Sequence, residues 1–296
     1  MTQRNDGSPS YGLAEAVEGL EALIGQQHIA EDYVRFRAGL LKAQWAVRET
    51  LEKSLRQTER KPNGKPRVPA LDAETVAFDR ELLASLCEAL RDTVAGPGDD
   101  DGEVPRLAAA AKEAPTLLDG LVRATAFGPD REYLELLSER LDISADALLF
   151  VGRMLAAPFV AVAARHVGGA SPTATDTGGC ALCGSPAALA LLAGEEGKRT
   201  LFCSLCGSSY GFKRLACPHC GNDETDALTY IRPSDSDPRW IETCDKCKRY
   251  IKTIDARKLP AGRPFIPVVE ETATLHLDLL AEKEGCARGL PYVACG

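Results

Sequence analysis

The chain has 296 residues, of which 45% are hydrophobic and 26% are charged, and its formal net charge is −8. This composition is typical of a globular protein that is long enough for more than one domain. The negative charge argues against non-specific binding to nucleic acid, and no stretch approaches the roughly 20 apolar residues of a membrane span. The polar start, MTQRNDGSPS, carries no secretion pattern, so we expect a cytoplasmic protein.

Residues 1–167 are predicted to form a helical domain, because apolar side chains recur at helical spacing along most of this segment. The first clear helix begins at Ile29, and a second is expected to open at Asp72. The segment Lys61–Ala70 separates them, since its three prolines and its glycine break a helix.

The second half of this domain is expected to hold shorter helices and one long apolar helix. An acidic loop, Gly96–Pro105, precedes one or two short helices within 107–126, and another helix spans 129–140. Ser144 is suited to cap the N-terminus of Ala145–Val167, which is the most apolar helix of the domain.

Eight of the 11 cysteines form four Cys-x-x-Cys turns, here called knuckles, within 68 residues. Two knuckles that face each other provide the four sulfur ligands that Zn²⁺ or a rubredoxin-type iron prefers. The gaps between knuckles are 19, 10 and 23 residues, and the two longer gaps are each long enough for a β-hairpin. We therefore pair the knuckles in sequence order, although a crossed pairing would also satisfy the ligand count. The predicted sites are Cys180, Cys183, Cys203 and Cys206, and then Cys217, Cys220, Cys244 and Cys247.

Other interpretations of these cysteines fit less well. Gly184, Gly207 and Gly221 follow three of the four knuckles, where a metal site favours a residue that tolerates positive φ, and Lys248 follows the fourth. Disulfides are disfavoured by the expected compartment, and a thioredoxin-like site uses one such pair in a longer α/β domain. Metal binding is the interpretation that explains all four pairs.

The remaining cysteines and His219 are not expected to be ligands. Cys87 lies on an apolar helical face and is interpreted as a core residue. Cys286 and Cys295 lie in the C-terminal tail outside the paired pattern, and the sulfur ligands flanking His219 already complete a site.

The predicted fold class is α plus small β, an all-helical domain followed by two rubredoxin-like or zinc-ribbon modules. A final helix, Glu270–Glu284, is expected to pack back on another domain. The predicted divisions are 1–167 (helical domain), 168–179 (linker), 180–214 and 215–262 (the two modules), and 263–296 (C-terminal helix and tail).

The residues predict no enzyme, because the chain has no phosphate-binding loop or nucleophile motif, and closed four-cysteine sites lack an open coordination position. Cys180–Lys252 contains ten Lys/Arg and nine Asp/Glu, which is not the basic surface of a nucleic-acid-binding ribbon. The function classes that remain are an interaction protein and a one-electron carrier. A nucleic-acid-binding ribbon is the least favoured alternative.

The spacing also resembles a known family. The second and third knuckles enclose an aromatic-x3-Arg motif, and the fourth precedes a Tyr-hydrophobic-Lys motif, as in the FdhE family of formate dehydrogenase accessory proteins. One departure is a Tyr where that family usually has Trp. The residues concerned are Tyr210, Arg214, Tyr250 and Lys252, and the similarity extends to Ala30–Phe36 and Glu270–Leu280.

The resemblance implies a cytoplasmic protein needed to assemble or activate an exported respiratory formate dehydrogenase. It implies contact with the catalytic subunit of that enzyme and two bound metal ions, iron or zinc, in four-cysteine centres. We expect the metals to be mainly structural, and a redox role stays open. The face carrying Tyr210 and Arg214 is the expected contact with the partner, unless both residues pack inside the modules. The alternative function is a free-standing rubredoxin-like electron carrier.

Overall fold

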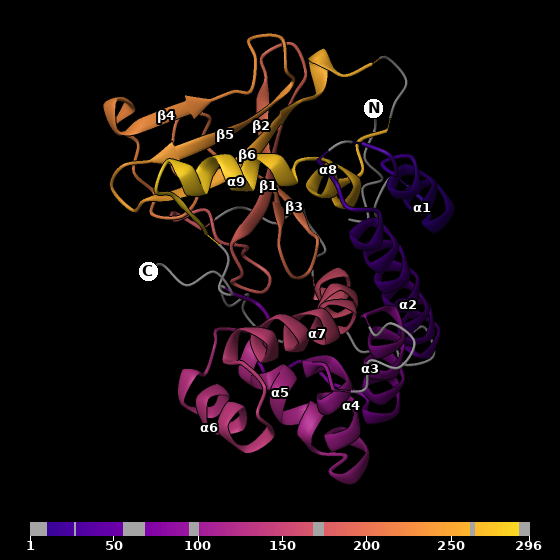
Figure 1. The fold of residues 1–296 in the computed structure, drawn as a ribbon. Helices are drawn as coiled ribbons and strands as arrows, with labels where there is room; N and C mark the ends of the chain where they lie inside the picture. The colour runs from indigo at the N-terminus through magenta and orange to yellow at the C-terminus, as the bar shows by residue number, and fades with distance from the viewer. Residues whose placement is uncertain are drawn as a thin grey trace.

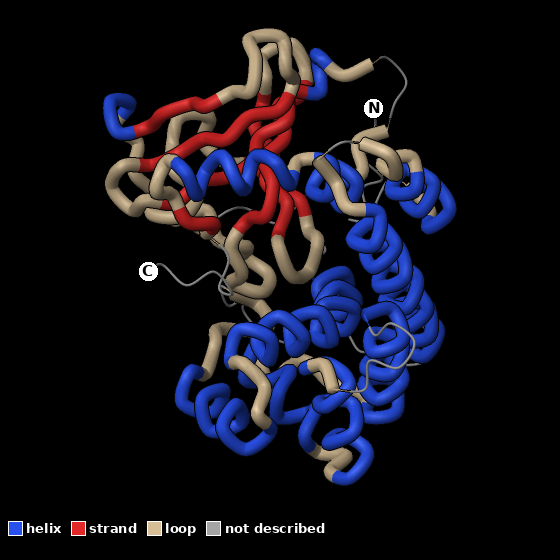
Figure 2. The backbone as a smooth tube through the Cα atoms, in the orientation of Figure 1, coloured by secondary structure: helices blue, strands red, loops and turns tan. Residues whose placement is uncertain are grey.

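The computed structural model describes residues 11–26, 28–55, 69–94, 101–167, 175–260 and 264–289. In these residues, helices fill the N-terminal half, and a mixed sheet with two further helices fills the C-terminal half (Figure 1; Figure 2). This arrangement confirms the predicted α plus small β class. Most of the predicted loop Lys61–Ala70, residues 168–174 of the predicted linker, and Cys295 lie outside the described residues. The helices of the N-terminal half are α1 (Leu13–Glu21), α2 (Glu31–Leu55), α3 (Arg80–Val94), α4 (Glu103–Glu113), α5 (Leu117–Ala126), α6 (Arg131–Leu141) and α7 (Ala145–Val167).

The second helix predicted from the sequence begins later than expected. Asp72 belongs to a turn in which its Oδ1 accepts a hydrogen bond from the backbone N–H of Thr75 at 2.9 Å. Helix α3 begins only at Arg80, because Asp79 caps it by accepting a hydrogen bond from the N–H of Leu82 at 3.0 Å. The segment therefore contains two residues that could cap a helix, Asp72 and Asp79, and Asp79 is the one that caps α3.

Residues 96–100 of the predicted acidic loop lie outside the described residues, and its last three predicted residues belong to α4, which begins at Glu103. Pro105 lies in the first turn of α4. Backbone N–H groups in this turn have no acceptor within the helix, so the N–H that proline lacks costs no hydrogen bond. The two short helices expected within 107–126 are present as α4 and α5.

Helix α7 is the central element of the helical part. Its predicted cap is confirmed, since Ser144 Oγ accepts a hydrogen bond from the N–H of Ala147 at 3.2 Å. By length and composition, α7 is the one helix of the described residues that could cross a membrane. Its most apolar stretch is, however, 72% buried inside the protein, packed among α2, α3, α5 and α6, which is the environment of a core helix.

Strands from both cysteine-bearing segments join one mixed sheet in the order β3-β2-β1-β6-β5-β4, with β7 paired to β6. The hairpins β1–β2 and β4–β5 lie between successive knuckles, as predicted. A parallel pairing of β1 with β6, from Leu189 opposite Lys252 to Leu192 opposite Asp255, connects the two halves. The strands are β1 (Ala187–Ala193), β2 (Lys198–Cys203), β3 (Ser209–Gly211), β4 (Leu228–Ile231), β5 (Arg239–Cys244), β6 (Arg249–Asp255) and β7 (Ala287–Arg288).

The parallel pairing decides where the knuckles lie. Strand β1 begins shortly after the knuckle that ends at Cys183, and β6 begins shortly after the knuckle that ends at Cys247. Parallel strands run in the same direction, so both knuckles lie at the same end of the sheet. The proposed modules 180–214 and 215–262 are thus two halves of one sheet, with their cysteines at a common end.

The predicted C-terminal helix is divided into α8 (Pro267–Ala273) and α9 (Leu275–Lys283). Thr274 separates them with φ −110° and ψ 23°, and its hydroxyl donates to the carbonyl of Glu270 at 2.7 Å. Helix α8 shares an apolar core with α1 and α2, whereas α9 covers β5 (Figure 1). The expectation that the final helix packs on the other parts of the chain is therefore confirmed for both pieces.

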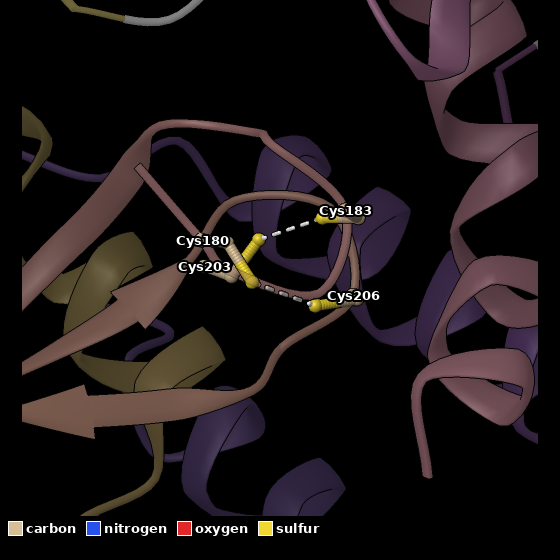
Figure 3. Close-up of side chains that lie close together, drawn as sticks. All are labelled: Cys180, Cys183, Cys203 and Cys206. Carbon is tan, nitrogen blue, oxygen red and sulfur yellow. Dashed lines mark hydrogen bonds between the residues drawn. The ribbon is translucent and has the colours of Figure 1, made fainter. Parts of the chain in front are cut away.

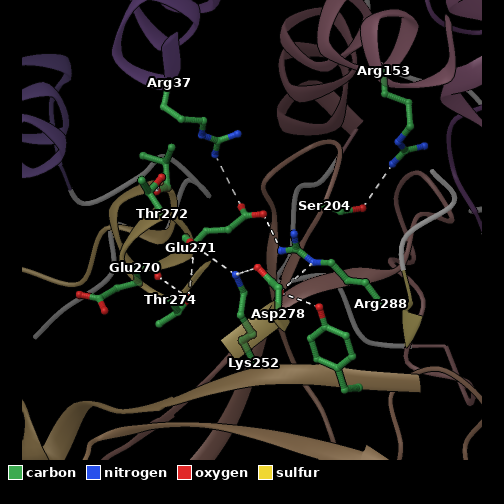
Figure 4. A network of polar contacts seen from close by, with 12 residues as sticks. Arg37, Arg153, Ser204, Lys252, Glu270, Glu271, Thr272, Thr274, Asp278 and Arg288 are labelled. Carbon is green, nitrogen blue, oxygen red and sulfur yellow. Dashed lines mark hydrogen bonds and ion pairs between the residues drawn. The ribbon is translucent and has the colours of Figure 1, made fainter. Parts of the chain in front are cut away.

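A buried ionic network connects α8 and α9 to the sheet (Figure 4). Lys252 Nζ donates to Asp278 Oδ2 at 3.0 Å and to the backbone carbonyl of Glu271 at 3.1 Å. The Tyr250 hydroxyl donates to Asp278 Oδ1 at 2.6 Å, and Arg288 pairs with Glu271 at 2.6 Å. Because Lys252 is fully buried, its ammonium group requires such partners. The network therefore gives a structural role to two segments that carry the sequence resemblance.

The network predicts a pH-dependent stability. Burial opposes the charge of Glu271, but the positive charges of Arg288, Arg37 and Lys252 outweigh this effect and lower its pKa to about 2. A folded-state pKa below the unfolded value of about 4.5 contributes stability above pH 4.5, and this contribution is lost as the pH falls toward 2. We expect Glu271→Gln to lower the free energy of unfolding by roughly 2–3 kcal/mol at pH 7.

Urea unfolding of both proteins between pH 3 and 7 measures this difference. It should shrink to roughly half or less near pH 3. Glu284→Gln, at an exposed position after α9, is the matched control and should show no such trend. A Glu271→Gln difference that stays constant over this range would contradict the assignment.

Candidate metal centres

The eight paired cysteines form two groups of four sulfur atoms. Within each group the four Sγ atoms all lie within 4.8 Å of one another. The grouping follows the sequence order of the knuckles. We call Cys180, Cys183, Cys203 and Cys206 the first cluster, and Cys217, Cys220, Cys244 and Cys247 the second cluster.

The distances between the sulfur atoms fit a tetrahedral ion. Metal–sulfur bonds of about 2.3 Å give a tetrahedron with edges of about 3.8 Å. A disulfide would require about 2.05 Å, and these cysteines are free thiols. Each cluster can therefore hold one metal ion, and four thiolates suit both zinc and iron. The closest Sγ–Sγ contacts are Cys180–Cys206 at 3.7 Å, Cys183–Cys203 at 3.4 Å, Cys217–Cys247 at 3.7 Å and Cys220–Cys244 at 3.7 Å.

The backbone turns explain why the knuckles have this shape. Gly184, Gly207 and Gly221 adopt φ values of 74°, 70° and 76°, as the sequence pattern predicts. The fourth knuckle reaches the same conformation without glycine, since Lys248 has φ 52°. The N–H of Lys248 donates to the carbonyl of Cys244 at 2.8 Å, and this bond closes the turn.

Neighbouring groups favour thiolates in part of the first cluster. Hydrogen bonds from the other thiols, that of Cys180 first, hold the pKa of Cys183 well below its ordinary value. Burial raises the pKa of Cys203, although the N–H of Leu205 lies 3.5 Å from its sulfur. The four sulfur atoms therefore share protons as one unit, and a bound divalent ion would hold all four as thiolates.

The first cluster lies between the helices and the sheet (Figure 3). Its cysteines have exposed fractions between 0% and 6% and belong to the same apolar core as α3, α5 and α7. The segment before α3 covers the first knuckle: the N–H groups of Ala70 and Leu71 donate to the carbonyls of Ala181 and Leu182 at 3.0 and 2.7 Å. This centre is therefore enclosed by parts of the chain that are distant in sequence.

Arg153 is a residue of this centre that sequence reasoning missed. It lies in α7 with an exposed fraction of 2%, and its guanidinium reaches Ser185 Oγ at 3.4 Å and Ser204 Oγ at 3.3 Å. It also donates to the carbonyls of Thr125 and Ala126 at 3.2 and 3.4 Å. The signal was an arginine inside the most apolar helix, because a buried cation needs nearby acceptors.

The second cluster is open on one side. Cys217 and Cys244 are buried, whereas Cys220 is exposed and Cys247 is half-buried. Burial raises the pKa of Cys247 to about 11. The two clusters thus have the same donor set in different surroundings.

Of the two interpretations of Tyr210 and Arg214, the structure supports the one in which Tyr210 packs inside the modules and Arg214 bonds a carbonyl there. The Tyr210 side chain is buried, with an exposed fraction of 2%, and its hydroxyl donates to the carbonyl of Gly178 at 3.0 Å. Gly178 packs so closely on the third knuckle that a Cβ atom there would lie 2.6 Å from the carbonyl oxygen of Pro218. Tyr210 therefore links the surroundings of the two clusters, and Arg214 donates to the carbonyl of Gly197 at 3.3 Å.

The side chains of His219, Cys87 and Cys286 do not belong to either group of four sulfur atoms. His219 contributes its backbone N–H to Cys217 Sγ at 3.4 Å, and its ring Nε2 lies 3.0 Å from the carbonyl of Tyr250. Cys87 is a buried core residue on α3, where burial raises its pKa to about 12. Cys286 belongs to a small apolar core beneath α9.

Comparisons with known proteins agree with this architecture. The family model "FdhE, C-terminal domain" matches residues 215–293. A curated relative from Aquifex aeolicus, "Protein FdhE homolog", is 38% identical over 109 residues, which cover 36% of this chain and 38% of that relative. A relative of the same name from Haemophilus influenzae is 23% identical over 272 residues, covering 90% of this chain and 82% of that relative.

A solved structure supports the same fold over the whole chain. The crystal structure of the FdhE protein from Pseudomonas aeruginosa superimposes with a TM-score of 0.59, covering 99% of this chain and 97% of that chain at 22% identity. The family model and the curated relatives match by sequence, and the crystal structure matches by fold. The chain is therefore similar to FdhE proteins by sequence, most clearly over residues 215–293, and shares the fold of the FdhE protein from Pseudomonas aeruginosa.

Proposed function

We propose that this protein is a non-catalytic accessory protein for the assembly or activation of a formate dehydrogenase. In this proposal it acts in the cytoplasm by contact with the catalytic subunit of that enzyme. The observation that carries the proposal is the combination of the similarity to FdhE proteins with two four-cysteine clusters in one chain. The large helical part supports a role in protein recognition, since a small electron carrier would not require it.

Each cluster is proposed to bind one metal ion, zinc or iron, through all four of its cysteines. Four sulfur ligands at tetrahedral spacing leave no coordination position for a substrate, which favours a structural or electron-transfer role over metal-assisted hydrolysis. A bound ion would hold together the two knuckles of its cluster. If the ion is iron, it would add one-electron chemistry at the same ligands.

A free-standing rubredoxin-like electron carrier is the second candidate. The exposed edge of the second cluster favours it, because electron transfer to another protein requires a centre near the surface. The two candidates differ in their dependence on a partner. An accessory protein must bind the enzyme it serves, whereas a carrier needs only brief contacts.

The test is a clean deletion of the gene in the source organism, together with affinity purification of the tagged chain. We expect formate oxidation to be lost while the catalytic subunit is still synthesised, and we expect that subunit to be retained by the tagged chain. Mass spectrometry under native conditions and elemental analysis should give two metal ions per chain.

The plasmid-borne wild-type gene is the control and should restore formate oxidation. Unchanged formate oxidation in the deletion strain would overturn the accessory function. Normal formate oxidation with a measurable loss of an unrelated redox pathway would favour the carrier instead.

A further inference from the structure

The two clusters differ in how far solvent reaches their sulfur atoms. All four cysteines of the first cluster are buried, with Cys206 the most exposed at 6%. In the second cluster, Cys220 is exposed and Cys247 is half-buried. These two residues come from different knuckles, the third and the fourth, so the open side exposes one ligand from each half of the site.

The cover over the first cluster is made of several independent parts. The segment Ala70–Leu71 hydrogen-bonds to the first knuckle, and Arg153 from α7 reaches the hydroxyls of Ser185, two residues after that knuckle, and of Ser204, within the second knuckle. These contacts lie within the largest apolar core of the described residues. Cys183 lines a cavity of about 590 Å³ that Arg153 also lines, but its exposed fraction is only 2%, so a competing ligand has far less direct access to these sulfur atoms than to Cys220.

The side chains next to the open edge of the second cluster provide little cover. Lys248 pairs with Asp245 at 2.8 Å, and Lys246 pairs with Glu224 at 3.1 Å, with all four side chains more than half exposed. Such exposed ion pairs contribute little stability and rearrange at small cost. Among the described residues, a ligand that approaches Cys220 therefore meets exposed charged groups instead of a packed core.

We propose that the second cluster is the exchange centre of this protein, and that the first cluster is a closed structural centre. In this view a sulfur-bearing ligand attacks the ion of the second cluster at the edge formed by Cys220 and Cys247. A metal–sulfur bond to the incoming thiolate forms as the bond to Cys220 breaks, and the freed Cys220 thiolate takes the proton that the incoming thiol gave up. No oxidation occurs in this step. The inference rests on the proposed binding of one ion by each cluster.

The test is metal release from the full-length protein loaded with two Zn²⁺ ions. Excess 4-(2-pyridylazo)resorcinol, a coloured chelator, is added at neutral pH, and release is followed by absorbance. We expect two phases of one ion each, with the faster at least tenfold faster than the slower. Millimolar glutathione, a sulfur-bearing ligand, should accelerate the fast phase and leave the slow phase unchanged.

Labelling with N-ethylmaleimide and peptide mass spectrometry identify the site that exchanges. Cys220 and Cys247 should be modified during the fast phase, before Cys183 and Cys206. A matched pair of variants gives a second measurement: Cys247→Ser should abolish the fast phase, and Cys206→Ser, the corresponding position of the first cluster, should abolish the slow one. If Cys206→Ser does not yield soluble protein, the order in which the wild-type cysteines are labelled still shows which cluster releases its ion first.

If the two bound ions are released at one common rate, the proposal that the second cluster is an exchange centre is contradicted. The binding of two ions would still hold. Earlier labelling of the first cluster would contradict the exchange centre as well. Fewer than two ions per loaded chain would instead contradict the metal binding on which it rests.

Discussion

Cys203→Ser is expected to remove the ion of the first cluster and to unfold the junction between the helices and the sheet. Cys203 ends β2 and lies in the same apolar core as residues of α3, α5 and α7. Structural zinc sites contribute roughly 10–16 kcal/mol to folding, which is comparable to the whole stability of a domain of about 5–15 kcal/mol. Loss of one ligand should therefore lower the free energy of unfolding by about 5 kcal/mol or more.

Thermal unfolding, limited proteolysis and the metal content of the purified variant measure this effect. Cys247→Ser is the matched control, because it removes one ligand of the second cluster, whose open edge lies outside the main core. We expect it to cost one ion and to leave the helical part resistant to proteolysis. Equal loss of stability in the two variants would show that the clusters support the fold to the same extent.

Arg153→Met is expected to have the next largest effect. The substitution keeps a long apolar side chain but removes the donor for two backbone carbonyls and two serine hydroxyls at a site with 2% exposure. Each buried acceptor left without a partner costs about 1–3 kcal/mol, so we expect a loss of roughly 3–5 kcal/mol. The change also removes a positive charge close to a centre that would carry a formal charge of −2 with a divalent ion.

Arg153→Lys is the control, since it keeps the charge and loses the planar, multiple-donor geometry. It should lie between the wild-type protein and Arg153→Met, both in melting temperature and in the rate of the slow phase of zinc release. If Arg153 only filled space, Arg153→Met would match the wild-type protein in both measurements.

The elements that the sequence predicted correctly have local causes. Asp130 caps α6 by accepting a hydrogen bond from the N–H of Tyr133, and Ser144 caps α7 within three residues of its start. The cysteine pairs were recognised for the same reason, because a knuckle is a turn closed by its own backbone. The φ values of Gly184, Gly207 and Gly221 confirm that local pattern.

Some elements depend on distant partners more than on their own local sequence. Strand β1 has the sequence Ala187-Ala-Leu-Ala-Leu-Leu-Ala193, whose residues favour a helix. It becomes a strand because β2 and β6 pair with its two edges. The predicted C-terminal helix is interrupted at Thr274, because α8 packs on α1 and α2 while α9 packs on the sheet.

The sequence by itself determined the helical and β regions, the two groups of four cysteines and the resemblance to the FdhE family, because cysteine spacing, turn chemistry and apolar periodicity are local properties. The tertiary structure decided how those parts relate to one another. It placed both clusters at one end of a single sheet, since a parallel pairing joins strands about sixty residues apart. It enclosed one cluster under α7 with Arg153 and left Cys220 of the other exposed, because burial depends on which distant segments fold over a site.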